Sequence, residues 1–103
     1  MIIKTKPNDA PKVQAAVDGR IMHSDDRIEA ILLTLKPGDE IPLHKNPFDV
    51  LFAGIEGSAT LVTPSEEFTI EPSETIFLTS DEDRAWNNQG KVTAIVMVFK
   101  ILK

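Results

Sequence analysis

The side chains that could do chemistry in this sequence are few and widely spaced. There is no cysteine, and the two histidines are His23 and His44. No serine lies at a telling spacing from either histidine, so the sequence points to no nucleophile with an adjacent base. Arg84 follows the acidic run Asp81–Asp83, and it either pairs with one of those acids or binds a carboxylate or phosphate of a ligand. His44 could donate or accept a hydrogen bond, with a charge that can change near neutral pH.

The composition of the chain excludes several classes of protein. The chain has 103 residues, of which 42% are hydrophobic, and a formal net charge of -5. This length predicts one domain spanning residues 1–103. The acidic balance argues against nucleic-acid binding, which needs clustered Lys and Arg. The longest apolar run, Ile95–Phe99, is too short for a bilayer, and no secretory signal begins the sequence, so we expect a cytoplasmic protein without a membrane partner.

The elements that must position these side chains are short strands. Apolar residues come in brief runs separated by turn formers, which favours an all-β sandwich or barrel of nine to ten strands. The segment that follows the N-terminal prolines, Lys12–Val17, is the weakest candidate. The expected strands are Lys12–Val17, Arg20–His23, Ile28–Leu35, Glu40–Lys45, Asp49–Ile55, Ser58–Thr63, Glu67–Ile70, Thr75–Thr79, Arg84–Asn87 and Val92–Leu102.

Two of these strands are apolar on both faces. In both Ile28–Leu35 and Val92–Leu102, the even and the odd positions each carry aliphatic side chains. A two-sheet sandwich buries only one face of each sheet, so the second face needs another cover. A second copy of the chain would provide it, which predicts a homodimer. The alternative is that loops or the N-terminal segment lie over one sheet.

The residues from Gly38 to Gly57 carry a resemblance to a known family. Gly38, His44 and Gly57 match the first cupin motif, G-x5-H-x-H-x3-E-x6-G, at both glycines and the first histidine. The second cupin motif is matched by Ser73 through Asn88 in spacing, but only Asn88 keeps the family residue type. The chain thus resembles a small single-domain cupin, and the resemblance implies a cupin-type double-stranded β-helix, or jelly-roll barrel. Asn88 takes the place of an asparagine that closes a turn in the family, which is a structural role.

The resemblance also implies where a metal would bind. In cupins two histidines, a glutamate and a third histidine hold one divalent metal, and the matching positions here are His44, Asn46, Val50 and Arg84. Transition metals need three or four N or O donors. Asn46 offers a neutral carbonyl, Val50 offers no donor, and the guanidinium of Arg84 stays protonated and repels a cation. We therefore expect no metal cofactor, with His44 as the one weak ligand candidate.

Other residues could in principle rebuild a divalent metal site. His23, Glu40, Asp49 and the acidic run Asp81–Asp83 supply further donors. Asp49 neighbours the family's glutamate position, and a bulge at Pro47 could turn its side chain inward. The acidic run alone is more typical of a solvated surface loop.

If the family geometry holds, the barrel mouth forms a mostly apolar pocket with a few polar groups, which is typical of a small-molecule site. The expected ligand-binding residues are His44, Asn46 and Arg84, with Phe52, Trp86 and Val50 as walls. The favoured function is therefore metal-free binding of a small, anionic ligand in a sensor or auxiliary role. The alternatives are an enzyme, either with an altered metal site or a metal-free isomerase, epimerase or lyase using His44, and a structural domain whose barrel is plugged by side chains. In that last case Trp86 and His44 are core residues.

Overall fold

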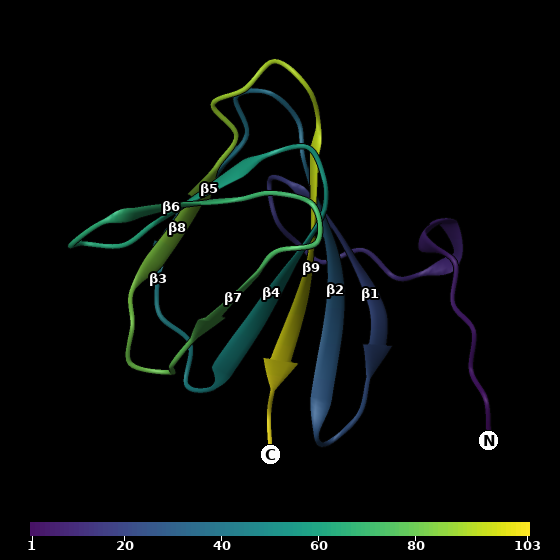
Figure 1. The fold of residues 1–103 in the computed structure, drawn as a ribbon. Helices are drawn as coiled ribbons and strands as arrows, with labels where there is room; N and C mark the ends of the chain where they lie inside the picture. The colour runs from purple at the N-terminus through teal and green to yellow at the C-terminus, as the bar shows by residue number, and fades with distance from the viewer.

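Nine strands and one 3-10 helix make up the computed structural model, which describes residues 1–103. The elements are η1 (Pro7–Asp9), β1 (Asp18–Ser24), β2 (Ile28–Leu35), β3 (Glu40–His44), β4 (Asp49–Glu56), β5 (Ala59–Val62), β6 (Glu67–Ile70), β7 (Thr75–Leu78), β8 (Arg84–Asn87) and β9 (Ala94–Ile101). They form a five-stranded sheet of order β1-β2-β9-β4-β7 and a four-stranded sheet of order β3-β8-β5-β6, in which every pairing is antiparallel (Figure 1). The expected all-β double-stranded fold is confirmed.

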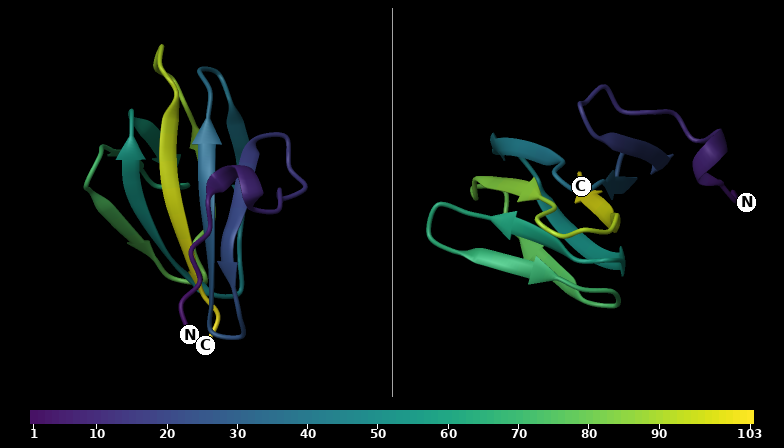
Figure 2. Two further views of the ribbon diagram at one scale, coloured as in Figure 1. Left: turned by 90° about the vertical axis from the view of Figure 1, so that its right-hand side faces the viewer. Right: turned by 90° about the horizontal axis from the view of Figure 1, so that it is seen from above.

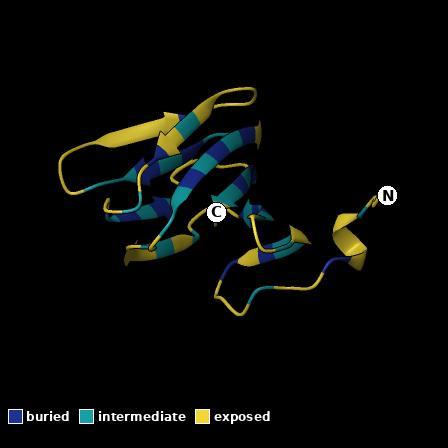
Figure 3. Cartoon of the chain, turned by 90° about the horizontal axis from the view of Figure 1, so that it is seen from below, coloured by how far each residue is buried: buried dark blue, intermediate teal, exposed yellow.

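The strands bury every second residue between the two sheets. In β2 and β9 the inward side chains, such as Leu35 and Val96, alternate with outward ones that stay partly exposed, as the colours along the strands in Figure 3 show. Branched residues dominate β2, and Pro37 and Gly38 follow its end, which explains why its bounds match the sequence expectation. Fourteen buried residues form one hydrophobic core between the sheets.

One expected strand is wrong. Lys12–Val17 is an irregular segment that joins the sheet only through an isolated bridge between Lys12 and Arg20. No main-chain hydrogen bond involves residues 14–17. The segment instead curves over the space between the sheets, where Val13 and Val17 pack against the core.

Three residues have a positive φ, and two of them, Gly38 and Ser73, follow a proline in a turn. Gly38 follows Pro37 with a φ of 87°, and Asp39 N–H donates to Lys36 O at 2.9 Å. This is the arrangement of a type II turn, and it explains the glycine at the start of the first cupin motif. Ser73 follows Pro72 in the same way with a φ of 71°, so the backbone of the second motif is retained although its glycine is not.

Replacing Ser73 by glycine is therefore expected to stabilise the protein. A left-handed conformation costs an L-residue about 1–2 kcal/mol, and the greater flexibility of glycine in the unfolded chain offsets part of the gain. Ser73→Gly should raise the free energy of unfolding by about 0.5–1 kcal/mol in urea titration. Ser65→Gly, in another turn but without a positive φ, is the matched control and should give no increase.

Asn88 ties three segments together after β8. Its buried amide donates to Leu35 O and to Val92 O, both at 2.8 Å, and its Oδ1 accepts from Gly90 N–H at 2.9 Å. Its main chain pairs with Gly38 and Asp39. The structural role expected for this residue is confirmed, because it closes its own turn and fixes the end of β2.

The outward face of the five-stranded sheet is apolar. Cross-strand rows across β2, β9 and β4 place Leu32 beside Met97, and Met97 beside Ala53. Met1, Ile2 and Ile3 are 110%, 96% and 64% exposed, and the N-terminal end lies away from the sheets in the right-hand view of Figure 2. Nearer to β1, Ala10 is buried and its carbonyl oxygen accepts from Arg20 Nη1 at 3.1 Å. Residues 1–3 therefore supply no second cover, whereas the part of the N-terminal segment around Ala10 contacts β1. The protein contains no helix that is both long and apolar enough to cross a membrane.

Candidate functional site

Strands β3 and β8 bring two of the expected site residues side by side. In their pairing His44 is the partner of Arg84, and Ile41 is the partner of Trp86. A register shift between Ile41 and His44 puts both on the inner side although they are three residues apart. Pro42 lies at this bulge. Because proline has no main-chain N–H, the irregular pairing here does not leave a donor of this residue without an acceptor. The irregularity in this strand pairing thus lies in β3, ahead of Pro47, where the sequence leaves a bulge open.

A cavity of about 240 Å³ lies at this end of the barrel, between the two sheets and the segment that precedes β1. Five of the six expected site residues line it: His44, Asn46, Phe52, Arg84 and Trp86. The remaining lining residues are Val13, Ala15, Val17, Ile31, Leu33, Ile41, Val98 and Lys100. Val50 does not line the cavity, because its fully buried side chain is packed within the hydrophobic core.

Sequence reasoning missed one charged lining residue. Lys100 follows Val96 and Val98 at the two-residue spacing of β9, and that alternation alone would have placed it on the inner face. Its ammonium lies 3.4 Å from Glu29 Oε1 and 5.6 Å from the centre of the Phe48 ring. Lys100 is therefore a cavity cation that already has partners in the protein.

Arg84 is a cavity cation without such a partner. Its residue is 3% exposed, and Nη1 is buried with no hydrogen bond to any protein atom. No ion pair joins it to the preceding acids, although Asp81 and Glu82 are exposed nearby in sequence. Burial lowers the pKa of Arg84, and the charge of Asp83 opposes this shift. The guanidinium nevertheless keeps its charge at neutral pH, because arginine is the most basic side chain in proteins.

The charged residues that line the cavity are both positive, and Glu29 pairs with one of them, Lys100, from outside the lining. Arg84 and Lys100 contribute two positive charges, and none of the lining residues is acidic. Nine of the thirteen lining residues are hydrophobic, so the cations sit in surroundings that screen charge poorly. Such a cavity attracts small anions and disfavours cations.

His44 offers an acceptor at the cavity mouth. Its residue is exposed, and Nδ1 lies 2.9 Å from Pro42 O. A carbonyl oxygen can only accept, so Nδ1 carries the hydrogen of this bond. In the neutral ring Nε2 is then an acceptor, and no protein group donates to it.

The aromatic wall of the cavity is ordered by packing. Phe52 and Trp86 are both buried, and their rings meet edge to face with centres 5.0 Å apart at an interplanar angle of 81°. The two residues therefore belong to the core and to the cavity surface together, rather than to one of the two.

The family's metal ligands do not fit these residues. Of the four corresponding positions, Val50 has no donor and is enclosed in the core, while Arg84 is a cation in the cavity. Nowhere in the chain do three or more His, Cys, Asp or Glu side chains converge. Asp49 does not turn inward, because its carboxylate accepts from Ser80 N–H at 3.0 Å. Glu40 lines a separate hollow on the outer side of β3 and β8.

His23, the other histidine, lies near the end of β1, and its Nε2 is 2.9 Å from Asp25 Oδ2 in the turn that follows. The amides of Arg27 and Ile28 donate to Asp25 Oδ1. These hydrogen bonds, that of His23 first, lower the pKa of Asp25 to about 2. His23 therefore serves the turn and not the cavity.

The hydrogen bonds of the Asp25 carboxylate predict that the stability of the protein depends on pH. Because the pKa of Asp25 is lower in the folded chain than its ordinary 3.8, the bonds stabilise the fold above about pH 4 and are lost as the pH falls towards 2. Asp25→Asn should flatten the decline of melting temperature between pH 4 and 2. Asp26→Asn, an exposed neighbour, should leave the decline as in the parent, and equal slopes for both variants would contradict the assignment.

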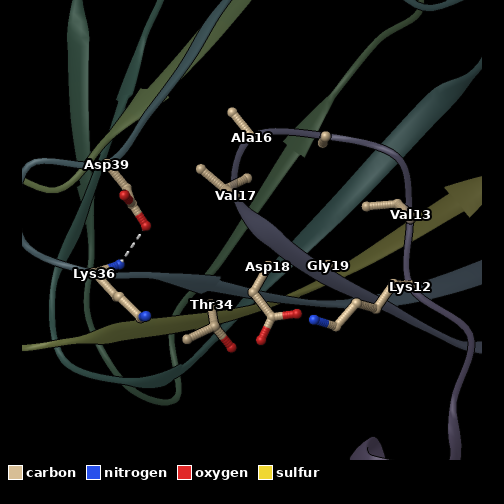
Figure 4. A pocket seen from close by; sticks show the side chains of 10 residues that line it. Lys12, Val13, Ala16, Val17, Asp18, Gly19, Thr34, Lys36 and Asp39 are labelled. Carbon is tan, nitrogen blue, oxygen red and sulfur yellow. Dashed lines mark hydrogen bonds between the residues drawn. The ribbon is translucent and has the colours of Figure 1, made fainter.

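A second hollow of about 260 Å³ lies on the other side of the segment before β1. Figure 4 shows its polar side chains, with Lys12 and Asp18 near each other and Lys36 N–H donating to Asp39. Charges of both signs line this hollow, and they are exposed at the surface. It lacks the uniform charge and the buried polar atom of the inner cavity, and the inner cavity is therefore the candidate site.

Comparison with known proteins places this fold in a family. The family model described as auxin binding protein matches residues 9–95. The chain belongs to the auxin-binding protein family. A tobacco (Nicotiana tabacum) relative, auxin-binding protein T92, is 30% identical over 82 residues, which cover 69% of this chain and 44% of the relative. The chain thus spans less than half the length of the curated relative it matches.

Solved structures agree on the cupin fold of this family member. The polyketide cyclase RemF from Streptomyces resistomycificus superposes with a TM-score of 0.87 at 18% identity, covering 100% of this chain and 81% of RemF. A cupin-2 domain protein from Shewanella frigidimarina gives 0.69 at 14% identity, covering 81% of this chain and 78% of that protein. The resemblance to a small cupin is confirmed, and at these identities the likeness concerns the fold.

Proposed function

We propose that this protein binds a small organic carboxylate in the barrel cavity, through Arg84, His44 and Asn46 and without a metal ion. The unpaired Nη1 of Arg84 carries the proposal. A buried charge without a partner is strongly unfavourable, whereas a carboxylate accepts two parallel hydrogen bonds from a guanidinium. The absence of acidic lining residues and the largely apolar wall support an anion with a hydrophobic body.

The cavity volume favours a ligand smaller than a typical drug. About 240 Å³ lies just below the range of roughly 300–1,000 Å³ for drug-sized ligands. Because the matched relatives are named auxin-binding proteins, indole-3-acetate belongs among the aromatic acids to be tried. A cavity of this size also argues against the alternative of a barrel plugged by side chains.

Calorimetric titration of matched acid and amide pairs tests the proposal. Benzoate, phenylacetate and indole-3-acetate should bind, and the corresponding primary amides should bind at least about tenfold more weakly, because they lack the charge that Arg84 requires. Equal affinity for acids and amides, or no binding of any acid, would overturn the proposal. Elemental analysis of protein purified without a metal-affinity tag tests the alternative enzyme with an altered metal site, which requires near-stoichiometric Mn, Fe, Ni or Zn.

We propose a homodimer formed through the outward face of the five-stranded sheet. Strands about 4.8 Å apart and up to eight residues long give this face roughly 500 Å² per copy, or about 1,000 Å² in a dimer, which reaches the lower limit for a specific interface. Met97→Lys should shift the mass measured by light scattering from dimer to monomer. Phe68→Lys, an exposed aromatic residue on the other sheet, should leave the mass unchanged. A monomeric parent would disprove the dimer.

A further inference from the structure

The pairing of β3 with β8 places a cation and a neutral acceptor next to each other in one cavity. His44 and Arg84 are direct cross-strand partners and both line the cavity. Side chains of such partners start about 5 Å apart. A carboxylate held by Arg84 therefore has the atoms attached to its neighbouring carbon, C2, within reach of His44.

The hydrogen bond made by His44 determines which substituent at C2 of the ligand can bind favourably. Nδ1 is used as a donor to Pro42 O, so the neutral ring presents an acceptor, Nε2, that has no protein donor. A hydroxyl at C2 can donate to this nitrogen. An ammonium at C2 could donate as well, but it would enter a cavity that already holds Arg84 and Lys100 and has no acid.

From this geometry we infer that the cavity prefers 2-hydroxycarboxylates over the unsubstituted acids and over 2-amino acids. Arg84 binds the carboxylate, His44 accepts from the 2-hydroxyl, and the apolar remainder of the ligand contacts Phe52 and Trp86. This inference rests on the proposed carboxylate binding and adds the substituent that the site recognises. His44 is then a specificity-determining residue, and Arg84 supplies affinity for every acid.

Three probes with one carbon skeleton test the inference: phenylacetate, mandelate and phenylglycine. In calorimetric titrations of the parent, one mandelate enantiomer should bind about 3- to 10-fold more tightly than phenylacetate, as expected for one added hydrogen bond, and phenylglycine should bind more weakly than both. In His44→Leu the ratio of mandelate to phenylacetate affinity should fall to about 1. His44→Gln, which keeps an acceptor, should restore part of the ratio.

His23→Leu is the matched control, because His23 is the other histidine and lies outside the cavity. It should keep the parent ratio. If phenylacetate binds the parent at least as tightly as both mandelate enantiomers, or if the ratio persists in His44→Leu, the inference is wrong while carboxylate binding stands. If neither phenylacetate and mandelate nor the smaller pair propionate and lactate bind the parent, the inference and the proposed function fail together.

Discussion

Arg84→Met is expected to make the ligand-free protein more stable and to weaken its binding of carboxylates. Arg84 as a whole residue is 3% exposed, its guanidinium has no ion-pair partner, and Nη1 is buried without a hydrogen bond, so its charge disfavours the folded state. Methionine has a similar length and fills the same space with apolar atoms. Replacing buried charged groups with well-packed hydrophobic residues is often stabilising by about 1–4 kcal/mol. We expect a gain of about 1–3 kcal/mol in the free energy of unfolding, measured in urea.

The same substitution should weaken carboxylate binding at least about tenfold, since a hydrogen bond to a charged group contributes about 1.5–3 kcal/mol. Arg27→Met is the matched control: the Arg27 side chain is 75% exposed, and its loss should change stability by less than about 0.5 kcal/mol. If Arg84→Met lowers stability as a broken ion pair would, then Arg84 has a partner within the folded protein and the anion site is misplaced.

Asn88→Ala is expected to cause the largest loss of stability among single substitutions outside the cavity. The amide of Asn88 satisfies Leu35 O and Val92 O, and its oxygen satisfies Gly90 N–H. Removing the side chain leaves three main-chain groups without these partners at the point where β2 ends and β8 turns towards β9. Each buried unsatisfied group costs about 1–3 kcal/mol, and part of this is recovered where water can enter.

We expect a loss of about 3 kcal/mol for Asn88→Ala, which corresponds to a fall of about 12–24 °C in melting temperature for a domain of this size. The neighbouring Asn87 provides the control, because its Oδ1 is buried and already lacks a hydrogen-bond partner. Asn87→Ala should therefore cost much less. Asn88→Asp should also be strongly destabilising, since a carboxylate would face two carbonyl oxygens, and a mild effect in either Asn88 variant would contradict the bonding described.

Most of the strands could be predicted from local sequence signals, because in these segments the local preference and the tertiary structure agree. In Ile28–Leu35, branched residues and the following Pro37 and Gly38 agree on one outcome, and the strand has these bounds. The strand predicted at Lys12–Val17 does not form, because apolar residues can line a cavity as well as a sheet. The apolar residues of this segment alone do not distinguish a cavity wall from a strand. Whether such a segment pairs depends on partners distant in the sequence.

The candidate site was predicted as far as the cupin resemblance reached, and the missing parts have physical reasons. Alternation along the chain puts Asp83 and Arg84 on opposite faces, and this pattern favours ligand binding by Arg84 over the alternative of an ion pair with Asp83. The bulge at Pro42 could not be located from the sequence, because Pro47 offers the same chemical reason for one. Whether Val50 faces the cavity or is covered depends on packing depth, which strand periodicity does not encode.

The irregular segment before β1 has a consequence for how this cavity could diversify. Ala15 and Val17 form part of the wall, yet residues 14–17 contribute no main-chain hydrogen bond to either sheet. Insertions or exchanges at Gln14, Ala15 and Ala16 can thus reshape the chamber while the ladders that hold the barrel together stay intact. One part of the cavity wall can therefore vary without changing the strands that hold the fold, which makes this segment a natural place to begin redesigning selectivity.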